Sequence, residues 1–138
     1  MKPTKACPVV LRTAQNRLEI LAFEHPLAGL QIIKGTIEVE EHPADAAVRE
    51  LCEESGVNGV ATVDLGLWQS GHEHQIWSLH LCEAARSLPD TWVHHAKDDG
   101  GHDFRFFWHP LGHAPSDRWH WLFRNALATI EKRLAELV

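Results

Sequence analysis

The stretch from Gly35 to Val57, GTIEVEEHPADAAVRELCEESGV, constrains the fold more than any other part of the chain. Pro43 suits the first position of a helix, because its missing N–H needs no partner there. Ser55 followed by Gly56 suits the helix end, because glycine adopts the left-handed cap conformation at little cost. The segment therefore predicts a loop followed by one helix of about three and a half turns.

Three glutamates fall on one side of this helix, towards its end: Glu50, Glu53 and Glu54. Apolar residues occupy another sector and mark the face expected to pack on the core: Ala47, Val48 and Leu51. Like charges three or four residues apart cost about 0.2–0.5 kcal/mol, and a carboxylate in the last turn opposes the helix dipole by about 0.3–1 kcal/mol. Two interpretations follow: a surface helix with surplus glutamate, or a platform for Mg²⁺, which prefers oxygen ligands.

The spacing of these residues resembles the signature of the Nudix hydrolase family. That signature has a glycine, five residues, a glutamate, seven residues, and then REUxEExGU, where U is a bulky aliphatic residue. Here Gly35 and Glu41 stand at that spacing before RELCEESGV, residues 49–57, so every defined position agrees. Two neighbouring positions depart from the usual family pattern: Lys34 replaces a frequent second glycine, and Glu40 replaces the glycine before Glu41. Because glutamate tolerates a positive φ poorly, we expect Glu40 to affect the geometry of the loop.

The resemblance implies an α/β fold, the Nudix α/β/α sandwich, in which a mixed sheet carries the catalytic loop and helix and a C-terminal helix. Residues 1–138 are expected to form a single Nudix hydrolase domain. The implied activity is a divalent-metal-dependent pyrophosphohydrolase that cleaves a nucleoside diphosphate linked to another moiety. Its substrate class stays open among nucleoside triphosphates, dinucleoside polyphosphates and nucleotide sugars, with KGTIE a weak indication of the second. The alternative is a non-catalytic Nudix-fold module that senses or binds a nucleotide.

The resemblance also assigns roles to particular residues. Glu50, Glu53 and Glu54 are carried over as ligands of Mg²⁺ or Mn²⁺, and either of the last two as the group that orients or deprotonates water. Arg49 completes the expected active-site set and pairs with Glu41 or Glu50, so that it acts through the glutamate it orients. Lys34 and Gly35 are the residues expected to bind phosphate.

The remaining elements are predicted from residue patterns. The expected strands are Ala6–Arg12 with Arg17–Phe23, Leu30–Ile33, Val60–Ser70 with Gln75–Cys82, and Phe104–Trp108. Ser116 or Asp117 can cap a closing helix that runs through Glu136. Its apolar stripe is expected to be Trp121, Leu122, Ala126, Ile130, Leu134 and Leu137. Strands in this order with two helices indicate an α/β layered domain.

Composition and charge exclude several functions. The formal net charge of −6 argues against binding to a DNA duplex, which requires clustered Lys and Arg. The sequence contains no apolar run of the roughly 20 residues that a membrane span needs, so a cytoplasmic protein is expected. A homodimer is compatible with the sequence.

Three widely spaced cysteines predict buried free thiols rather than a disulfide framework: Cys7, Cys52 and Cys82.

Histidine, tryptophan and aspartate raise further candidates. Many of the histidines gather in the second half of the chain, but their spacing matches no known zinc motif, and one or two could contact a base or phosphate: His72, His74, His94, His95, His102, His109, His113 and His120. Four tryptophans lie in strand-like segments where one could stack on a base: Trp68, Trp77, Trp92 and Trp108. Trp119 and Trp121 are expected to be packing residues of the closing helix. Asp98, Asp99 or Asp103 could supply an additional metal ligand, although DDGG is equally typical of a turn.

Overall fold

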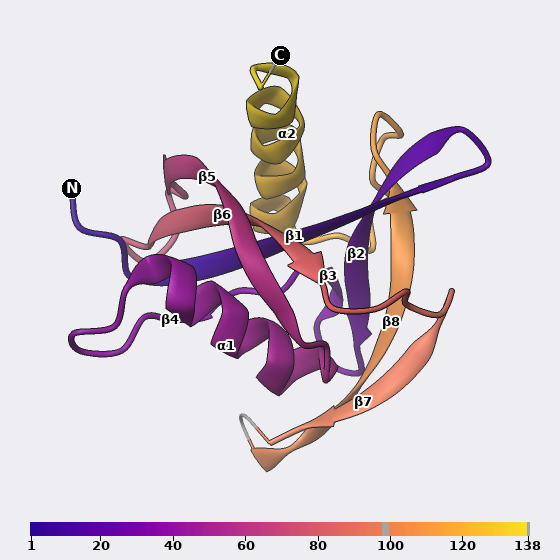
Figure 1. Ribbon diagram of the computed structural model, residues 1–138, viewed down its shortest axis with the longest axis horizontal. Coiled ribbons are helices and arrows are strands. Elements are labelled where there is room, and N and C mark those ends of the chain that lie inside the picture. The colour runs from indigo at the N-terminus through magenta and orange to yellow at the C-terminus, as the bar shows by residue number, and fades with distance from the viewer. Residues whose placement is uncertain (98–99, 138) are drawn as a thin grey trace.

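The computed structural model describes residues 1–97 and 100–137. Its strands are β1 (Lys5–Ala14), β2 (Arg17–His25), β3 (Gly29–Gln31), β4 (Gly35–Thr36), β5 (Gly59–Gln69), β6 (Ile76–Ala84), β7 (Trp92–Ala96) and β8 (His102–Pro110). Its helices are α1 (Pro43–Ser55) and α2 (Trp121–Ala135). In Figure 1, the indigo strand β1 crosses between the two helices, with α1 below it and α2 above.

The sheet is mixed and has the order β5-β6-β1-β2-β8-β7, with β3 and β4 paired to β2 and β1. The first half of β1, Lys5 to Val10, runs parallel to β6, whereas its second half, Leu11 to Ala14, forms an antiparallel hairpin with β2. Residues 6–10 of β1 are buried on both faces, as expected for a strand covered from both sides. This long strand therefore joins the two halves of the sheet.

Each helix covers its own hydrophobic cluster. Ala46, Ala47 and Leu51 of α1 pack in one cluster with residues that include Phe23 and Phe106. On the other face, buried residues of α2 pack with Trp77 and Leu79: Leu122, Phe123, Ala126, Leu127 and Ile130. Two helices packed with separate clusters of one mixed sheet confirm the predicted α/β sandwich.

The predicted bounds of α1 are confirmed, whereas those of α2 are wrong at its start. Gly56 takes the left-handed cap conformation with φ 78°, and its N–H donates to the carbonyl of Cys52. Helix α2 begins at Trp121, with His120 rather than Ser116 or Asp117 at its N-cap. The Ser116 carbonyl instead accepts from the Trp119 N–H at 3.1 Å in a preceding turn. Trp119 therefore lies before the helix, where it is buried.

Some details of the closing helix and the third strand also differ from prediction. Trp121 and Leu137 are 41% and 49% exposed, because Phe123 and Leu127 occupy the buried stripe in their place. Strand β3 ends at Gln31, before the buried pair Ile32 and Ile33. That pair was predicted as strand from its apolar character, but its side chains are buried without belonging to a strand.

The cysteines are free, but they are not all buried. Cys7 and Cys82 are buried, and burial raises the pKa of the Cys82 thiol to about 11. Cys52 is exposed, so the prediction of three buried thiols is wrong for this residue. The Cys52 side chain lies on the exposed face of α1, whereas the side chain of the preceding Leu51 faces the core. In the described part of the chain, neither helix has the length and apolar character needed to cross a membrane.

Candidate active site

A tight turn connects β4 to α1 and positions Glu41. The Glu41 N–H donates to the Glu38 carbonyl at 3.0 Å, and the Glu38 N–H donates to Glu41 Oε1 at 3.0 Å. Within this turn Glu40 has φ 64°, a left-handed conformation that favours glycine. Glu40 therefore adopts a glycine-like conformation at a position where family members usually have glycine.

Arg49 is the centre of a hydrogen-bonding network that joins this turn to the helix. Its Nε and Nη2 donate to the two carboxylate oxygens of Glu41 at 2.8 and 2.9 Å. Its Nη1 donates to Glu50 at 2.9 Å and to Glu53 at 3.2 Å, while Nη2 also reaches the Thr36 carbonyl at 2.8 Å. Arg49 thus contacts both glutamates that the sequence offered as its partner.

The network shifts the pKa values of both Glu41 and Arg49. Hydrogen bonds from Arg49, followed by the backbone N–H of Glu38, lower the pKa of Glu41 to about 2. In return, the Glu41 carboxylate and then Glu50 raise the pKa of the Arg49 guanidinium. The pair is therefore charged over the whole physiological range, and the bidentate geometry fixes its orientation.

The three glutamates of the helix differ in exposure. Glu50 and Glu54 are only 5% and 8% exposed, whereas the Glu53 side chain is 49% exposed. A Cβ on Gly35 would overlap the Glu50 carboxylate, so this carboxylate lies directly against the glycine backbone. An ordinary surface helix does not bury its glutamates, because burial of charge without compensation is costly. The second interpretation of the acidic cluster, a cation platform, therefore fits the structure better.

The chemistry of these groups fits a hard divalent cation. Three carboxylates from one helix, two of them largely withdrawn from water, provide oxygen donors, the ligands that Mg²⁺ and Mn²⁺ prefer. Glu50 and Glu53 share one nitrogen of Arg49 in this conformation. In residues 1–97 and 100–137, no group of three or more His, Cys, Asp or Glu side chains is already arranged so that it could hold a metal ion.

A cavity of about 940 Å³ opens in front of the helix. Glu38, Arg49 and the three glutamates line its acidic wall. Besides Arg49, two lysines and three histidines line it: Lys5, Lys34, His25, His72 and His120. Burial, followed by the nearby charge of Lys5, lowers the pKa of Lys34. The cavity therefore combines potential hydrogen-bond donors with the carboxylates of the helix.

Aromatic residues form a further part of the cavity wall, and sequence reasoning missed them. Phe23 of β2 stacks on Phe104 of β8 with ring centroids 4.5 Å apart, and His25 lies 5.2 Å from Phe104. The tryptophans proposed as stacking candidates are not among the described residues that line this cavity. Pairing of β2 with β8 brings these rings together across about 80 positions of sequence, so no local pattern could have identified them.

The late aspartates lie differently from the expectation. Asp103 Oδ1 accepts a hydrogen bond from His95 Nδ1 at 2.8 Å in an exposed pair, and Asp103 does not line the cavity. Asp98 and Asp99 lie outside the described residues. The expectation of an additional ligand from this loop therefore gains no support from Asp103 in this conformation.

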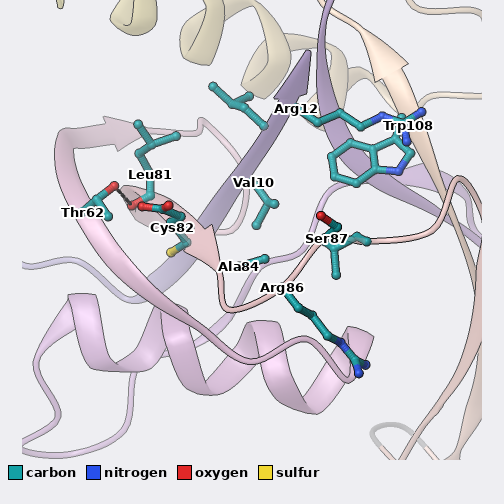
Figure 2. A pocket seen from close by; sticks show the side chains of 12 residues that line it. Val10, Arg12, Thr62, Leu81, Cys82, Ala84, Arg86, Ser87 and Trp108 are labelled. Atoms are coloured by element: carbon teal, nitrogen blue, oxygen red, sulfur yellow. Dashed lines mark hydrogen bonds between the residues drawn. The ribbon is translucent and has the colours of Figure 1, made fainter. Parts of the chain in front are cut away.

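A second cavity, of about 560 Å³, lies between β1, β6 and the segment that leads to β7. Figure 2 shows Arg12 alongside the Trp108 ring, with the guanidinium carbon 4.5 Å from the ring centroid. Glu19 and Asp90 already accept hydrogen bonds from Arg12 at 2.8 and 2.7 Å. This cavity contains no residue of the Gly35–Val57 signature, so the acidic cavity is the candidate active site.

The fold and the site together describe one kind of protein. It is an α/β sandwich in which a loop and a helix place several glutamates, bonded to one arginine, on the wall of a large cavity. The chain belongs to the NUDIX family, because the NUDIX domain matches residues 2–129. This confirms the predicted family, and membership supports the predicted class of enzyme, a pyrophosphohydrolase. Comparison with curated protein sequences gives no significant match.

Solved structures share the fold at low sequence identity. An ADP-ribose pyrophosphatase from Streptococcus suis is 14% identical with a TM-score of 0.68, and the match covers 99% of this chain and 94% of that one. The Nudix hydrolase RenU from M. smegmatis is 15% identical with a TM-score of 0.66, covering 99% and 88%. The NUDIX domain of Shewanella oneidensis NrtR, complexed with ADP ribose, is 16% identical with a TM-score of 0.62, covering 97% and 89%. At these identities the likeness establishes the fold.

Proposed function

We propose that this protein is a divalent-metal-dependent hydrolase that cleaves the pyrophosphate bond of a nucleoside diphosphate linked to another moiety. The observation that carries the proposal is the burial of Glu50 and Glu54 on α1, with the Glu50 carboxylate lying against Gly35 and bonded to Arg49. Such an arrangement concentrates negative charge on the wall of a cavity, where it would repel a diphosphate by itself. A bound cation reverses this effect.

In this proposal Glu50, Glu53 and Glu54 hold Mg²⁺ or Mn²⁺, which neutralises charge on the diphosphate and makes a bound water a better nucleophile. Glu53, the most exposed of the three, or Glu54 orients or deprotonates the attacking water. Arg49 and Glu41 act together to fix the helix against the loop, so that the glutamates keep their positions. Lys34 and Gly35, which line the cavity, bind a phosphate.

ADP-ribose is the first substrate to test within this class. The Streptococcus suis relative is described as an ADP-ribose pyrophosphatase, and the Shewanella oneidensis domain was solved with ADP ribose. The cavity of about 940 Å³ is large enough for such a ligand, since pockets for small molecules span about 300–1,000 Å³. Phe23 and Phe104 form part of the cavity lining, although both rings are almost fully buried, so they add apolar character to the wall rather than a free stacking surface.

Several broader expectations belong to the same proposal. Residues 1–138 act as one domain on a small-molecule nucleotide in the cytoplasm, without DNA as a partner. A homodimer is compatible with this function but is not needed for it, because one chain supplies all the residues assigned above.

The experiment is a substrate panel with purified protein, with and without Mg²⁺. It includes ADP-ribose, a nucleotide sugar, a dinucleoside polyphosphate and nucleoside triphosphates. Glu53→Gln should lose most of the activity, whereas Glu136→Gln, the same change on an exposed residue at the end of α2, should keep it. Binding without metal-dependent turnover of any compound would contradict the proposal and favour the alternative, a non-catalytic nucleotide-binding module.

A further inference from the structure

The end of α1 lacks the charges that normally stabilise a helix C-terminus. Its last turn contains Glu53 and Glu54 but no basic residue, so both side chains oppose the helix dipole. The last carbonyl groups of a helix also lack partners within the helix. The local cap satisfies part of this end, because the Gly56 N–H donates to the Cys52 carbonyl and the Ser55 hydroxyl donates to the Leu51 carbonyl. Donors to the Glu53 and Ser55 carbonyls are not part of this cap, although the turn carries two of the proposed metal ligands.

Strand β7 supplies two such donors. Trp92 Nε1 donates to the Ser55 carbonyl at 2.9 Å, and His94 Nε2 lies 3.1 Å from the Glu53 carbonyl. Because a carbonyl oxygen only accepts, the His94 hydrogen lies on Nε2. The two accepted carbonyls belong to the residues on either side of Glu54, so both bonds restrain the backbone next to this ligand.

The geometry around these bonds holds β7 close to the helix. Trp92 stacks on Phe106 of β8, with ring centroids 5.1 Å apart and an interplanar angle of 11°. A Cβ on Gly56 would lie 2.9 Å from His94 Nδ1, so glycine at the helix cap is also what allows His94 to approach. Val93 lies between the two donors and is 53% exposed, which agrees with the alternation of side chains along a strand.

We propose that Trp92 and His94 are positioning residues that clamp the C-terminal turn of α1 and thereby set the arrangement of Glu53 and Glu54 for cation binding. This inference rests on the proposed function for its effect on the metal site, but the clamp itself is a structural claim that can be measured separately. It explains how an acidic helix end keeps its shape before a cation arrives. The same backbone restraint is absent from the Nudix signature, because its donors come from about 40 residues further along the chain.

Trp92→Phe keeps the ring on Phe106 and removes only the indole donor. Trp108→Phe is a matched control, because Trp108 Nε1 donates to the Pro89 carbonyl at 3.0 Å, an equivalent bond away from α1. For the second donor, His94→Leu removes the N–H, whereas His94→Gln keeps an N–H at similar reach. His95→Gln, on the exposed side of the same strand, controls for the loss of a histidine.

Mn²⁺ binding is measured by electron paramagnetic resonance. The affinity should be about tenfold weaker in Trp92→Phe/His94→Leu and near wild-type in Trp108→Phe and His95→Gln. It should be largely restored in Trp92→Phe/His94→Gln. Hydrogen exchange should become faster at the amides of residues 51–58 in the first variant and not in the two controls. Unchanged exchange of that segment would overturn the clamp, and unchanged Mn²⁺ affinity with faster exchange would overturn its role in positioning the ligands. Absence of Mn²⁺ binding by the wild-type protein would count against the proposed function and against the role in ligand positioning, while the exchange data would still decide on the clamp.

Discussion

Replacing Glu40 by glycine is expected to stabilise the protein. Glu40 is exposed and sits at φ 64° between Val39 and Glu41. A residue with a Cβ pays about 1–2 kcal/mol for the left-handed conformation. Glycine avoids this cost but raises the conformational entropy of the unfolded chain, and this entropy lowers the gain in stability by about 0.4–1 kcal/mol. The expected net gain in the free energy of unfolding is about 0.5–1 kcal/mol.

For 138 residues the unfolding entropy is about 0.3 kcal/mol/K, so the gain corresponds to a rise in Tm of about 2–3 °C. Urea denaturation and calorimetry measure both quantities. Val39→Gly is the matched control, because Val39 is 94% exposed and is not among the residues with positive φ, so glycine there should destabilise by about 0.5–1 kcal/mol. Glu40→Gln tests whether removal of the charge alone is enough. Equal stabilisation by Glu40→Gln, or a loss of stability in Glu40→Gly, would refute the reasoning from backbone strain.

Three further predictions concern the same loop and helix. Gly35→Ala should destabilise the protein by about 1–3 kcal/mol and abolish most hydrolysis, because the new methyl group overlaps the Glu50 carboxylate; denaturation and the substrate panel would show this, and wild-type values in both would contradict it. Arg49→Lys should lower stability by about 2 kcal/mol and activity by at least about tenfold, because an ammonium group cannot reproduce the bidentate bonds to Glu41; retention of both would show that charge alone is sufficient. The pKa of Glu41 is about 2 in the folded state, below its ordinary value of 4.5, so its contribution to stability is complete above about pH 4.5 and is lost as the pH falls towards 2. Glu41→Gln should therefore flatten the dependence of stability on pH in that window, and an unchanged slope in urea titrations would remove Glu41 as its source.

Local sequence was sufficient for the loop and helix because their determinants lie within one short segment. Pro43 and Gly56 set the bounds of α1 through backbone preferences that act at single positions. The same segment raised the question of a positive φ at Glu40, and the structure answers it with φ 64°. The start of α2 was mispredicted because His120 accepts the Leu122 N–H at its N-cap, a role for which Ser116 and Asp117 are better known.

The amino-acid sequence by itself determined the family, the signature loop and helix, and the set of carboxylates with Arg49 beside them, because these depend on spacing along one continuous segment. Only the tertiary structure decided that Glu50 and Glu54 are withdrawn from water, that Phe23 stacks on Phe104, and that Trp92 and His94 reach the end of α1. Burial and contacts between distant strands depend on how the sheet pairs and on which face each helix covers, and no local pattern of residues records these.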